Sequence, residues 1–441
     1  MPLNEILAIA CIVSFFVLLA LGIPVALTLA VSGFVFGYIG FGALLFNLLP
    51  ARIFGVISNY TLIAIPLFVF MGVMLEKSRL ADELMDVIGH LAGSLRGGMG
   101  IGLVLVGVMM GATTGVVGAT IVTLGLLTLP ALLRRGYDKS VACGAICASG
   151  SLGQLIPPSL ILILLSDILG QSVGTLFAAA VMPGLLLSAV YVIYLLGLGW
   201  LRPDKVPPVP VEERDALARR DLWIKVLRVG LPPIGLVIGV LGSIIGGVAA
   251  PTEAASMGAL GSILVVAAAG RFNWSVLREA VYSTTRITAT MMFVLICAQV
   301  FALAFRGLQG EQLVHDLFNM VPGGITGVLL FMMALIFVLG FFIEWIEISY
   351  IVVPLFLPIL QAANVDLVWV AILIAVNLQS SFLTPPFGWA LFYLRGVAPP
   401  QVATLDIYRG VVPFIGLQLI TLAIVFLYPS LATWLPKAIG W

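Results

Sequence analysis

Residues 148–159 read ASGSLGQLIPPS and interrupt an otherwise apolar stretch of the sequence. Two consecutive prolines remove two backbone donors and disfavour helix at the residue before them, so this stretch predicts a broken helix. A similar stretch, NLQSSFLTPPFG, occupies residues 377–388. Adding 228 to the numbers of Pro157-Pro158 gives Pro385-Pro386, so the two breaks lie at matching places. The chain therefore contains two broken helices and an internal repeat.

The chain as a whole is far more apolar than a protein that folds in water. Of its 441 residues, 61% are hydrophobic and 9% are charged, and the mean hydropathy is +1.20. A soluble domain is about half apolar and about a quarter charged. This composition excludes a cytosolic enzyme, a secreted domain and a nucleic-acid-binding protein. It predicts an all-α polytopic membrane protein whose surroundings are a lipid bilayer, with no nucleic-acid partner.

Each half of the sequence predicts five crossings, one hairpin and one amphipathic arm. A crossing helix needs about twenty apolar residues, whereas the hairpin arms beside the polar stretch 111–120 have about twelve or thirteen. Arms of roughly 18–20 Å reach only halfway through a bilayer, which predicts a re-entrant hairpin. Because five is odd, the second half enters the membrane upside down. Inverted repeats with interrupted helices are typical of secondary transporters.

The predicted boundaries follow from the apolar and charged stretches. The first repeat, 1–201, comprises scaffold spans 4–75, an interfacial arm 76–98, a hairpin 99–133, a broken span 138–166 and a span 175–201. A charged loop, predicted to be cytoplasmic, occupies 202–228. The second repeat, 229–441, comprises scaffold spans 229–305, an arm 306–322, a hairpin 324–362, a broken span 367–394 and a span 407–435.

The distribution of basic residues predicts the orientation. With ten crossings, one side collects eighteen of the twenty-one Lys and Arg residues, in loops around 76–98, 134–139, 202–228, 271–286 and 395–409. Basic residues favour the cytoplasmic side. Both termini are therefore predicted to lie outside.

Polar residues gather at the four interruptions, which are two hairpin tips and two broken spans. Freed backbone carbonyls favour a cation such as Na⁺, and half-helix N-termini favour a carboxylate. We select Thr114, Gln154 and Ser380 as candidate substrate contacts. The alternative is that these small polar residues only permit close packing of helices.

Four charged side chains near membrane depth are further candidates. Glu344 and Glu347 are acidic and costly to bury, unless the tip sits high enough to reach water. Arg286 and Arg395 either balance a substrate carboxylate or extend to the interface.

No stretch of the sequence predicts catalysis. There is no GxGxxG, GxxxxGK[ST], HExxH or GxSxG motif, and four Cys and two His residues form no ligand pattern. The chain is predicted not to be an enzyme, and any transport must draw on an ion gradient.

Four stretches resemble the large membrane subunit of tripartite ATP-independent periplasmic (TRAP) transporters, the DctM type of the ion-transporter superfamily. They are PTEAA (251–255), GATTGVVGAT (111–120), GSLGQLIPPS (150–159) and NLQSSFLTPPFGWALFYLRGVAP (377–399). The resemblance extends from about residue 4 to residue 435. It implies an elevator-type, Na⁺-coupled importer in a bacterial or archaeal cytoplasmic membrane. It also implies a small four-helix membrane subunit and a periplasmic protein that delivers an organic acid such as a C4-dicarboxylate or a sugar acid.

The resemblance also implies where Na⁺ binds. Family sites at the hairpin tips and broken helices map onto eight residues of this chain: Gly111, Thr113, Ser149, Ser151, Gly340, Glu344, Asn377 and Thr384. Family members often carry Asp where this chain has Glu344. The alternative function is a self-sufficient Na⁺/dicarboxylate symporter that needs no delivery protein.

Overall fold

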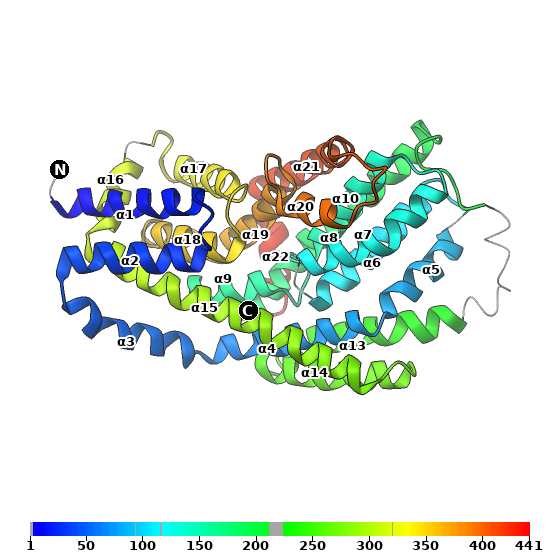
Figure 1. Ribbon diagram of the computed structural model, residues 1–441, viewed down its shortest axis with the longest axis horizontal. Helices are drawn as coiled ribbons and strands as arrows, with labels where there is room; N and C mark the ends of the chain where they lie inside the picture. Colours follow the sequence, from blue (N-terminus) through cyan, green and yellow to red (C-terminus); the bar gives the residue numbers. More distant parts are fainter. Residues whose placement is uncertain (1–2, 93, 115–116, 211–223, 320) are drawn as a thin grey trace.

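The computed structural model describes residues 3–92, 94–114, 117–210, 224–319 and 321–441, and these residues are almost entirely helical (Figure 1). The first half contains α1 (Leu3–Ala20), α2 (Val25–Phe41), α3 (Leu44–Ile57), α4 (Tyr60–Lys77), α5 (Leu80–Ala92), α6 (Gly98–Thr114), α7 (Val117–Arg134), α8 (Lys139–Leu152), α9 (Leu160–Leu169) and α10 (Val173–Leu201). The second half contains the π-helix η1 (Val226–Gly230), α13 (Leu231–Ile245), α14 (Pro251–Ala268), α15 (Trp274–Gly307), α16 (Gly310–Asn319), α17 (Gly324–Leu339), α18 (Trp345–Ala362), α19 (Leu367–Leu383), α20 (Trp389–Val397), α21 (Thr404–Leu427) and α22 (Ser430–Ala438). The predicted all-helical class is confirmed.

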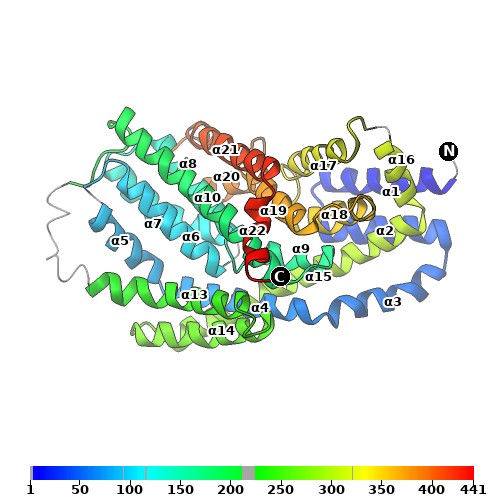
Figure 2. The ribbon, with the colours of Figure 1, turned by 180° about the vertical axis from the view of Figure 1, so that it is seen from behind.

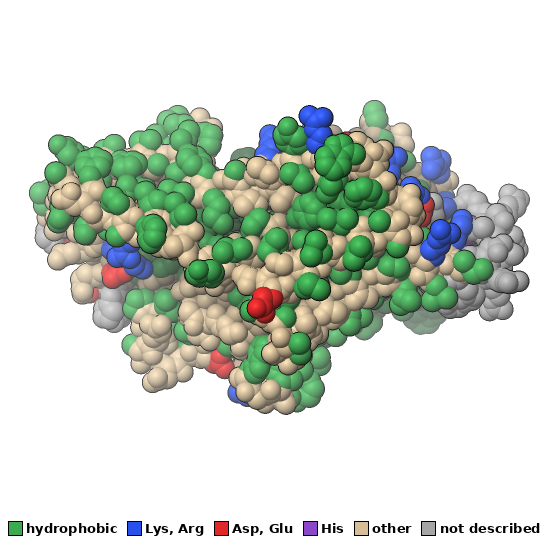
Figure 3. Space-filling model, turned by 90° about the horizontal axis from the view of Figure 1, so that it is seen from below, with side chains coloured by type: hydrophobic (Ala, Val, Ile, Leu, Met, Phe, Trp, Pro, Cys, Tyr) green, Lys and Arg blue, Asp and Glu red, His purple; other side chains and the backbone are tan. Residues whose placement is uncertain are grey.

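The surface of this chain is that of a membrane protein. Large apolar side chains are exposed along many helices, including Leu264 at 69% and Ile193 at 66%. Nine segments of the described residues are long and apolar enough to cross a membrane. On the face in Figure 3, most Lys and Arg side chains lie toward the end of the molecule where Figure 1 shows α5. A lipid environment explains why so much apolar surface stays outside the core.

The helix boundaries of the two halves follow the predicted shift of 228 residues. Adding 228 to the bounds of α7 gives 345–362, which are the bounds of α18. Adding 228 to those of α9 gives 388–397, one residue from the start of α20. The upside-down orientation of the second half stays a prediction.

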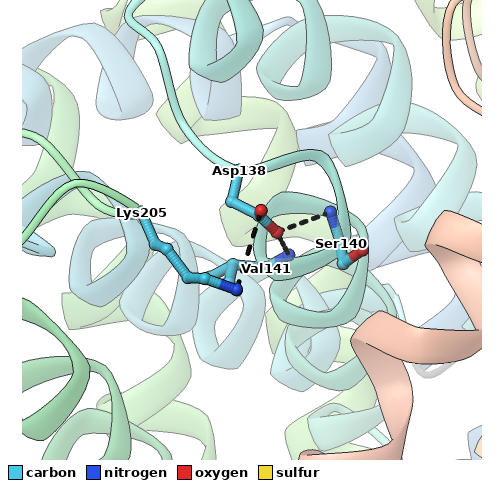
Figure 4. A network of polar contacts seen from close by, with 4 residues as sticks. All are labelled: Asp138, Ser140, Val141 and Lys205. Atoms are coloured by element: carbon cyan, nitrogen blue, oxygen red, sulfur yellow. Dashed lines mark hydrogen bonds and ion pairs between the residues drawn. The ribbon is translucent and has the colours of Figure 1, made fainter. Parts of the chain in front are cut away.

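The broken spans begin at equivalent aspartate caps. Asp138 accepts hydrogen bonds from the backbone N–H groups of Ser140 and Val141 at 3.0 and 3.1 Å, and Lys205 lies 3.8 Å from its other oxygen (Figure 4). Asp366 accepts equivalent bonds from Val368 and Trp369. These bonds satisfy N–H groups that have no partner inside the helix. Both aspartates therefore act as N-caps of the helices that begin the broken spans.

Removing this cap should weaken the first broken span. We expect Asp138→Ala to destabilise the protein by about 1 kcal/mol, because two amide donors lose their acceptor. Thermal unfolding of the purified protein in detergent measures the effect. Asp138→Asn is the matched control, since its side-chain oxygen still caps the helix. An equal loss in both variants would assign the effect to the ion pair with Lys205 instead.

The hairpin arms are longer than predicted. α6 has 17 residues and α7 has 18, so they extend about 26 and 27 Å at 1.5 Å per residue. The helices continue into the Gly- and Thr-containing stretch that we took as the tip, and α7 continues through Pro130. Length alone therefore does not distinguish a hairpin arm from a crossing, and re-entry of the hairpin stays a prediction.

One helix was not predicted separately, and most of one predicted loop, 271–286, is helical. Residues 44–57 form α3, which the sequence analysis did not separate from its neighbours, and residues 274–286 are the beginning of the 34-residue helix α15. Adding 228 to the range 44–77 of α3 and α4 gives 272–305, close to the bounds of α15. One long helix therefore stands in the second half where the first half has two.

The helices pack into a scaffold group and a hairpin group. α2 packs against α15, and α14 packs against α4. In the second group, which comprises α6–α9 and α17–α20, α6 and α7 pack against α8, and α17 packs against α19. The amphipathic arms α5 and α16 lie at opposite ends of the long axis (Figures 1 and 2). The last predicted span, 407–435, is divided into α21 and α22, and most of the charged loop 202–228 lies outside the described residues.

Candidate functional site

The two broken spans form the buried centre of the hairpin group. Residues Val141–Leu152 of α8 are all buried, as are residues Val370–Leu383 of α19. Both helices end at a non-helical segment that contains a cis Pro-Pro bond, Pro157-Pro158 and Pro385-Pro386. The polar residues of both breaks therefore lie inside protein.

Glycine allows the hairpins to approach the broken spans at backbone distance. A Cβ atom added to Gly111 of α6 would collide with the backbone of Gly153, and a Cβ added to Gly153 would collide with Gly111. In the second half a Cβ on Gly340 would collide with the Ser381 side chain. Gly153 and Ser381 correspond, because 153 plus 228 is 381. Each hairpin therefore packs in close contact with the broken span of its own half.

Most hydroxyl groups at the breaks are bonded to their own helices. Thr384 donates to the Ser380 carbonyl at 2.7 Å, and Ser151 donates to the Ala148 carbonyl at 2.9 Å. The Asn377 amide donates to the Met333 carbonyl of α17 at 2.7 Å. For these groups the structure supplies the packing role that the sequence left as an alternative.

Other buried polar atoms have no hydrogen-bond partner within the described part of the chain. They share a position at the breaks or the second tip: Ser149 Oγ, Gln154 Oε1, both amide atoms of Gln379 and Glu347 Oε2. A buried polar atom without a partner is costly. Buried atoms elsewhere, such as the Tyr191 hydroxyl and the Gln418 amide, also lack a partner among the described residues, so these atoms are candidate positions for an ion, water or substrate.

A cavity of about 240 Å³ lies where both halves meet. Six segments line it: the start of α7, the first break, α15, the second tip, α19 and α20. The lining residues used below are Gln154, Arg286, Glu344, Trp345, Phe382, Trp389 and Tyr393. The Tyr393 hydroxyl donates to Glu344 Oε1 at 3.4 Å. The cavity therefore combines a guanidinium, a carboxylate and aromatic side chains.

The structure brings together three of the predicted site residues, Arg286, Gln154 and Glu344. Arg286 lies in the first half of α15, inside the helix, and lines the cavity, whereas the sequence predicts it at the start of a span. Arg395 is exposed in the last turn of α20 and does not line the cavity, and neither does the buried Ser380. The side chains of Thr113 and Thr114 lie outside the described residues.

The sequence analysis missed the aromatic wall of the cavity. Trp345 follows Glu344 directly, and Trp389 and Tyr393 are four residues apart on α20. Residues four apart lie on the same side of a helix. The aromatic residues that follow the second tip and the second break in the sequence could have indicated this part of the cavity.

Two polar contacts join α4 to the hairpin group, one at each end of the helix. Asn59, the N-cap of α4, donates to Asp167 of α9 at 2.5 Å, and Asp167 also accepts from Tyr350 of α18 at 3.1 Å. At the other end, Thr123 of α7 donates to Glu76 at 3.2 Å. These bonds connect the scaffold group to the hairpin group in the conformation that the structure shows.

A family profile matches nearly the whole chain. The profile is the DctM component of the tripartite ATP-independent periplasmic transporter, and it matches residues 12–431. The chain is 31% identical to the C4-dicarboxylate TRAP transporter large permease protein DctM of Pseudomonas aeruginosa, across 89% of this chain and 90% of that protein. It is 29% identical to the ectoine TRAP transporter large permease protein TeaC of Halomonas elongata, across 95% of this chain and 96% of that protein.

A solved transporter structure has a similar fold. The YdaH transporter of Alcanivorax borkumensis aligns with a TM-score of 0.62 at 16% sequence identity, across 91% of this chain and 90% of that one. This likeness concerns the arrangement of helices.

Proposed function

Because the chain belongs to the DctM family, the large permease component of TRAP transporters, we propose that it imports a small organic acid by coupling to a Na⁺ gradient. The observation that carries the proposal is the cavity between the two broken spans, with Arg286 on α15 and Glu344 at the second tip. Arg286 is exposed and lines the cavity, and a guanidinium there can pair with a carboxylate through charge-assisted hydrogen bonds. Membership implies a small membrane subunit and a periplasmic binding protein as partners, in the inner membrane of a bacterium. The bias of Lys and Arg toward one set of loops supports our proposal that both termini lie outside.

Sodium coupling is supported by the donor set at the breaks. The Ser149 hydroxyl oxygen is fully buried and lacks a partner among the described residues, and Glu347 Oε2 is in the same position. Hydroxyl, carboxylate and freed carbonyl oxygens are the groups that suit a hard cation in a broken helix. Ser149 with the Gly111 region would hold one ion, and the second tip with the second break would hold another. A bound Na⁺ would supply positive charge that offsets the repulsion between the buried oxygen atoms and a carboxylate substrate.

We further propose an elevator movement. The hairpin group (α6–α9 and α17–α20) would carry the cavity, and the scaffold helices α1–α4 and α13–α15 would stay fixed. The seating of each hairpin on its own break supports a single moving body. Because α15 belongs to the scaffold, its contribution of Arg286 makes the cavity an interface between the two groups, so movement changes its walls.

Uptake into proteoliposomes tests coupling and dependence on the delivery protein together. The permease, its small membrane subunit and its binding protein are supplied with labelled succinate or labelled ectoine. We expect uptake to require an inward Na⁺ gradient and the binding protein. Ser149→Ala should raise the Na⁺ concentration for half-maximal uptake several-fold, since a buried oxygen is lost.

Ser166→Ala is the matched control, because this buried hydroxyl on α9 donates to the Ile163 carbonyl of its own helix. Its Na⁺ dependence should equal that of the unmodified protein. Uptake without the binding protein would instead support a self-sufficient symporter. Uptake that ignores the Na⁺ gradient would contradict the proposal.

A further inference from the structure

The cavity holds two opposite charges that are not paired with each other. Arg286 enters from α15 and Glu344 from the second tip, and no ion pair joins them in the described part of the chain. The only hydrogen bond to the Glu344 side chain among these residues is the 3.4 Å contact from Tyr393. Glu344 is half-buried and Arg286 is exposed, so a ligand that offers the opposite charge to each would gain most at the carboxylate.

The cavity lining also contains one hydrogen-bond donor and one acceptor that have no partner among the described residues. Trp389 Nε1 and Gln154 Oε1 are buried, and neither has a hydrogen-bond partner among the residues that the structure describes. Both residues line the cavity. An indole N–H only donates, whereas an amide oxygen only accepts. The cavity therefore requires both an acceptor and a donor or cation from whatever fills it.

Aromatic rings surround the carboxylate side of the cavity. Trp345 follows Glu344 in the chain, the Tyr393 hydroxyl contacts Glu344, and the ring of Trp389 lies 6.3 Å from that of Tyr393. Faces of Trp and Tyr attract organic cations, and the attraction is larger when the cation is desolvated. A carboxylate with aromatic neighbours is suited to an ammonium, amidinium or quaternary nitrogen group.

We propose that the substrate is a small zwitterion, a carboxylate that also carries a nitrogen cation. This inference rests on the proposed transport function and names its substrate class. The carboxylate would pair with Arg286, and the cation would lie against Glu344 and the aromatic rings. A dicarboxylate fits less well, because its second carboxylate would lie beside Glu344 and repel it. The cavity volume of about 240 Å³ is slightly below the roughly 300–1,000 Å³ of pockets that hold drug-sized ligands, so it suits a small molecule.

Three probes with the same number of non-hydrogen atoms separate charge from size. Glycine betaine is the zwitterion, 3,3-dimethylbutanoate is its isostere without the positive charge, and succinate is the dicarboxylate. Their dissociation constants are measured on the purified permease with its small membrane subunit, in Na⁺ and again in K⁺. We expect glycine betaine to bind at least about tenfold more tightly than either other probe in Na⁺.

Substitutions identify the side chains responsible. Glu344→Gln should weaken glycine betaine by about tenfold or more and leave 3,3-dimethylbutanoate within about twofold, because only the cation loses its partner. Arg286→Gln should weaken all three probes. Glu279→Gln, at an exposed position of the same helix α15, is the control and should change none.

Other outcomes overturn the inference. Tighter binding of succinate than of glycine betaine would assign Glu344 to a Na⁺ site that neutralises it. Equal weakening of glycine betaine and its isostere by Glu344→Gln would make Glu344 a structural residue. Absence of binding by all three probes also contradicts the inference. Na⁺-driven, binding-protein-dependent uptake of succinate would retain the proposed function and reject only the zwitterion.

Discussion

Gly153→Ala is expected to abolish uptake and to lower the unfolding temperature markedly, although it adds a single methyl group. Gly153 has φ −64° and ψ −15°, which alanine adopts without strain, so the backbone conformation is not the obstacle. The obstacle is the backbone of Gly111, which occupies the place of the new Cβ. Overpacking a core commonly costs 1–3 kcal/mol, and about that much or more is expected where two backbones must separate. Gly111→Ala should have the same effect from the other side.

The matched control is Gly239→Ala on α13. Gly239 is exposed and a Cβ there meets no atom within 4 Å, so stability should be unchanged or slightly higher. Thermal unfolding in detergent and uptake into proteoliposomes give the two readouts. If Gly153→Ala transports normally, the first hairpin does not need its close seat on the break.

A cross-link between Asn59 and Asp167 is expected to stop transport almost completely. The two side chains are in contact, and they join α4 of the scaffold group to α9 of the hairpin group. The four native cysteines are first replaced, and Asn59→Cys with Asp167→Cys is treated with a short reducible cross-linker. A moving body tied to its scaffold cannot complete its stroke. Uptake should return after reduction, and docking of the binding protein should persist.

The control pair shares one of these positions. Tyr350 also contacts Asp167, but α18 and α9 both belong to the hairpin group. Cross-linking Tyr350→Cys to Asp167→Cys should therefore leave most of the uptake intact. Transport that survives the Asn59–Asp167 link would show that the boundary between scaffold and carrier is drawn in the wrong place.

The sequence was most informative about the broken spans and their symmetry. Proline pairs and aspartate caps act locally, so they mark Pro157-Pro158 and Asp138 without any knowledge of tertiary structure. The ends of α3 and α15 could not be predicted in the same way. Hydropathy marks where an apolar stretch ends, but a helix continues beyond that point where tertiary packing supports it. Polar residues such as Arg278 and Arg286 therefore made a helical segment look like a loop.

The sequence predicted which types of residue form the candidate site, but it identified only some of the individual residues. Gln154 and Glu344 were identified because polar residues beside interruptions are expensive to bury. Arg395 was selected on the same ground, yet its position on α20 faces away from the cavity lining. Which side of a helix faces a cavity depends on packing, and the aromatic residues of α20 read equally well as ordinary core.

In the elevator that we propose, the hydrogen bond from Asn59, between α3 and α4, to Asp167 would make the two end states unequal in energy. Adding 228 to Asn59 and Asp167 gives Ile287 and Arg395, which cannot reproduce the hydrogen bond at this joint. In the elevator that we propose, the opposite end of the stroke therefore has no equivalent bond to form. A difference of about 1.4 kcal/mol corresponds to a tenfold ratio of populations. We therefore expect an empty carrier to populate mainly the conformation that keeps the bond between Asn59 and Asp167. Inward and outward fluxes then saturate at different substrate concentrations, while the ion gradient alone sets the final distribution.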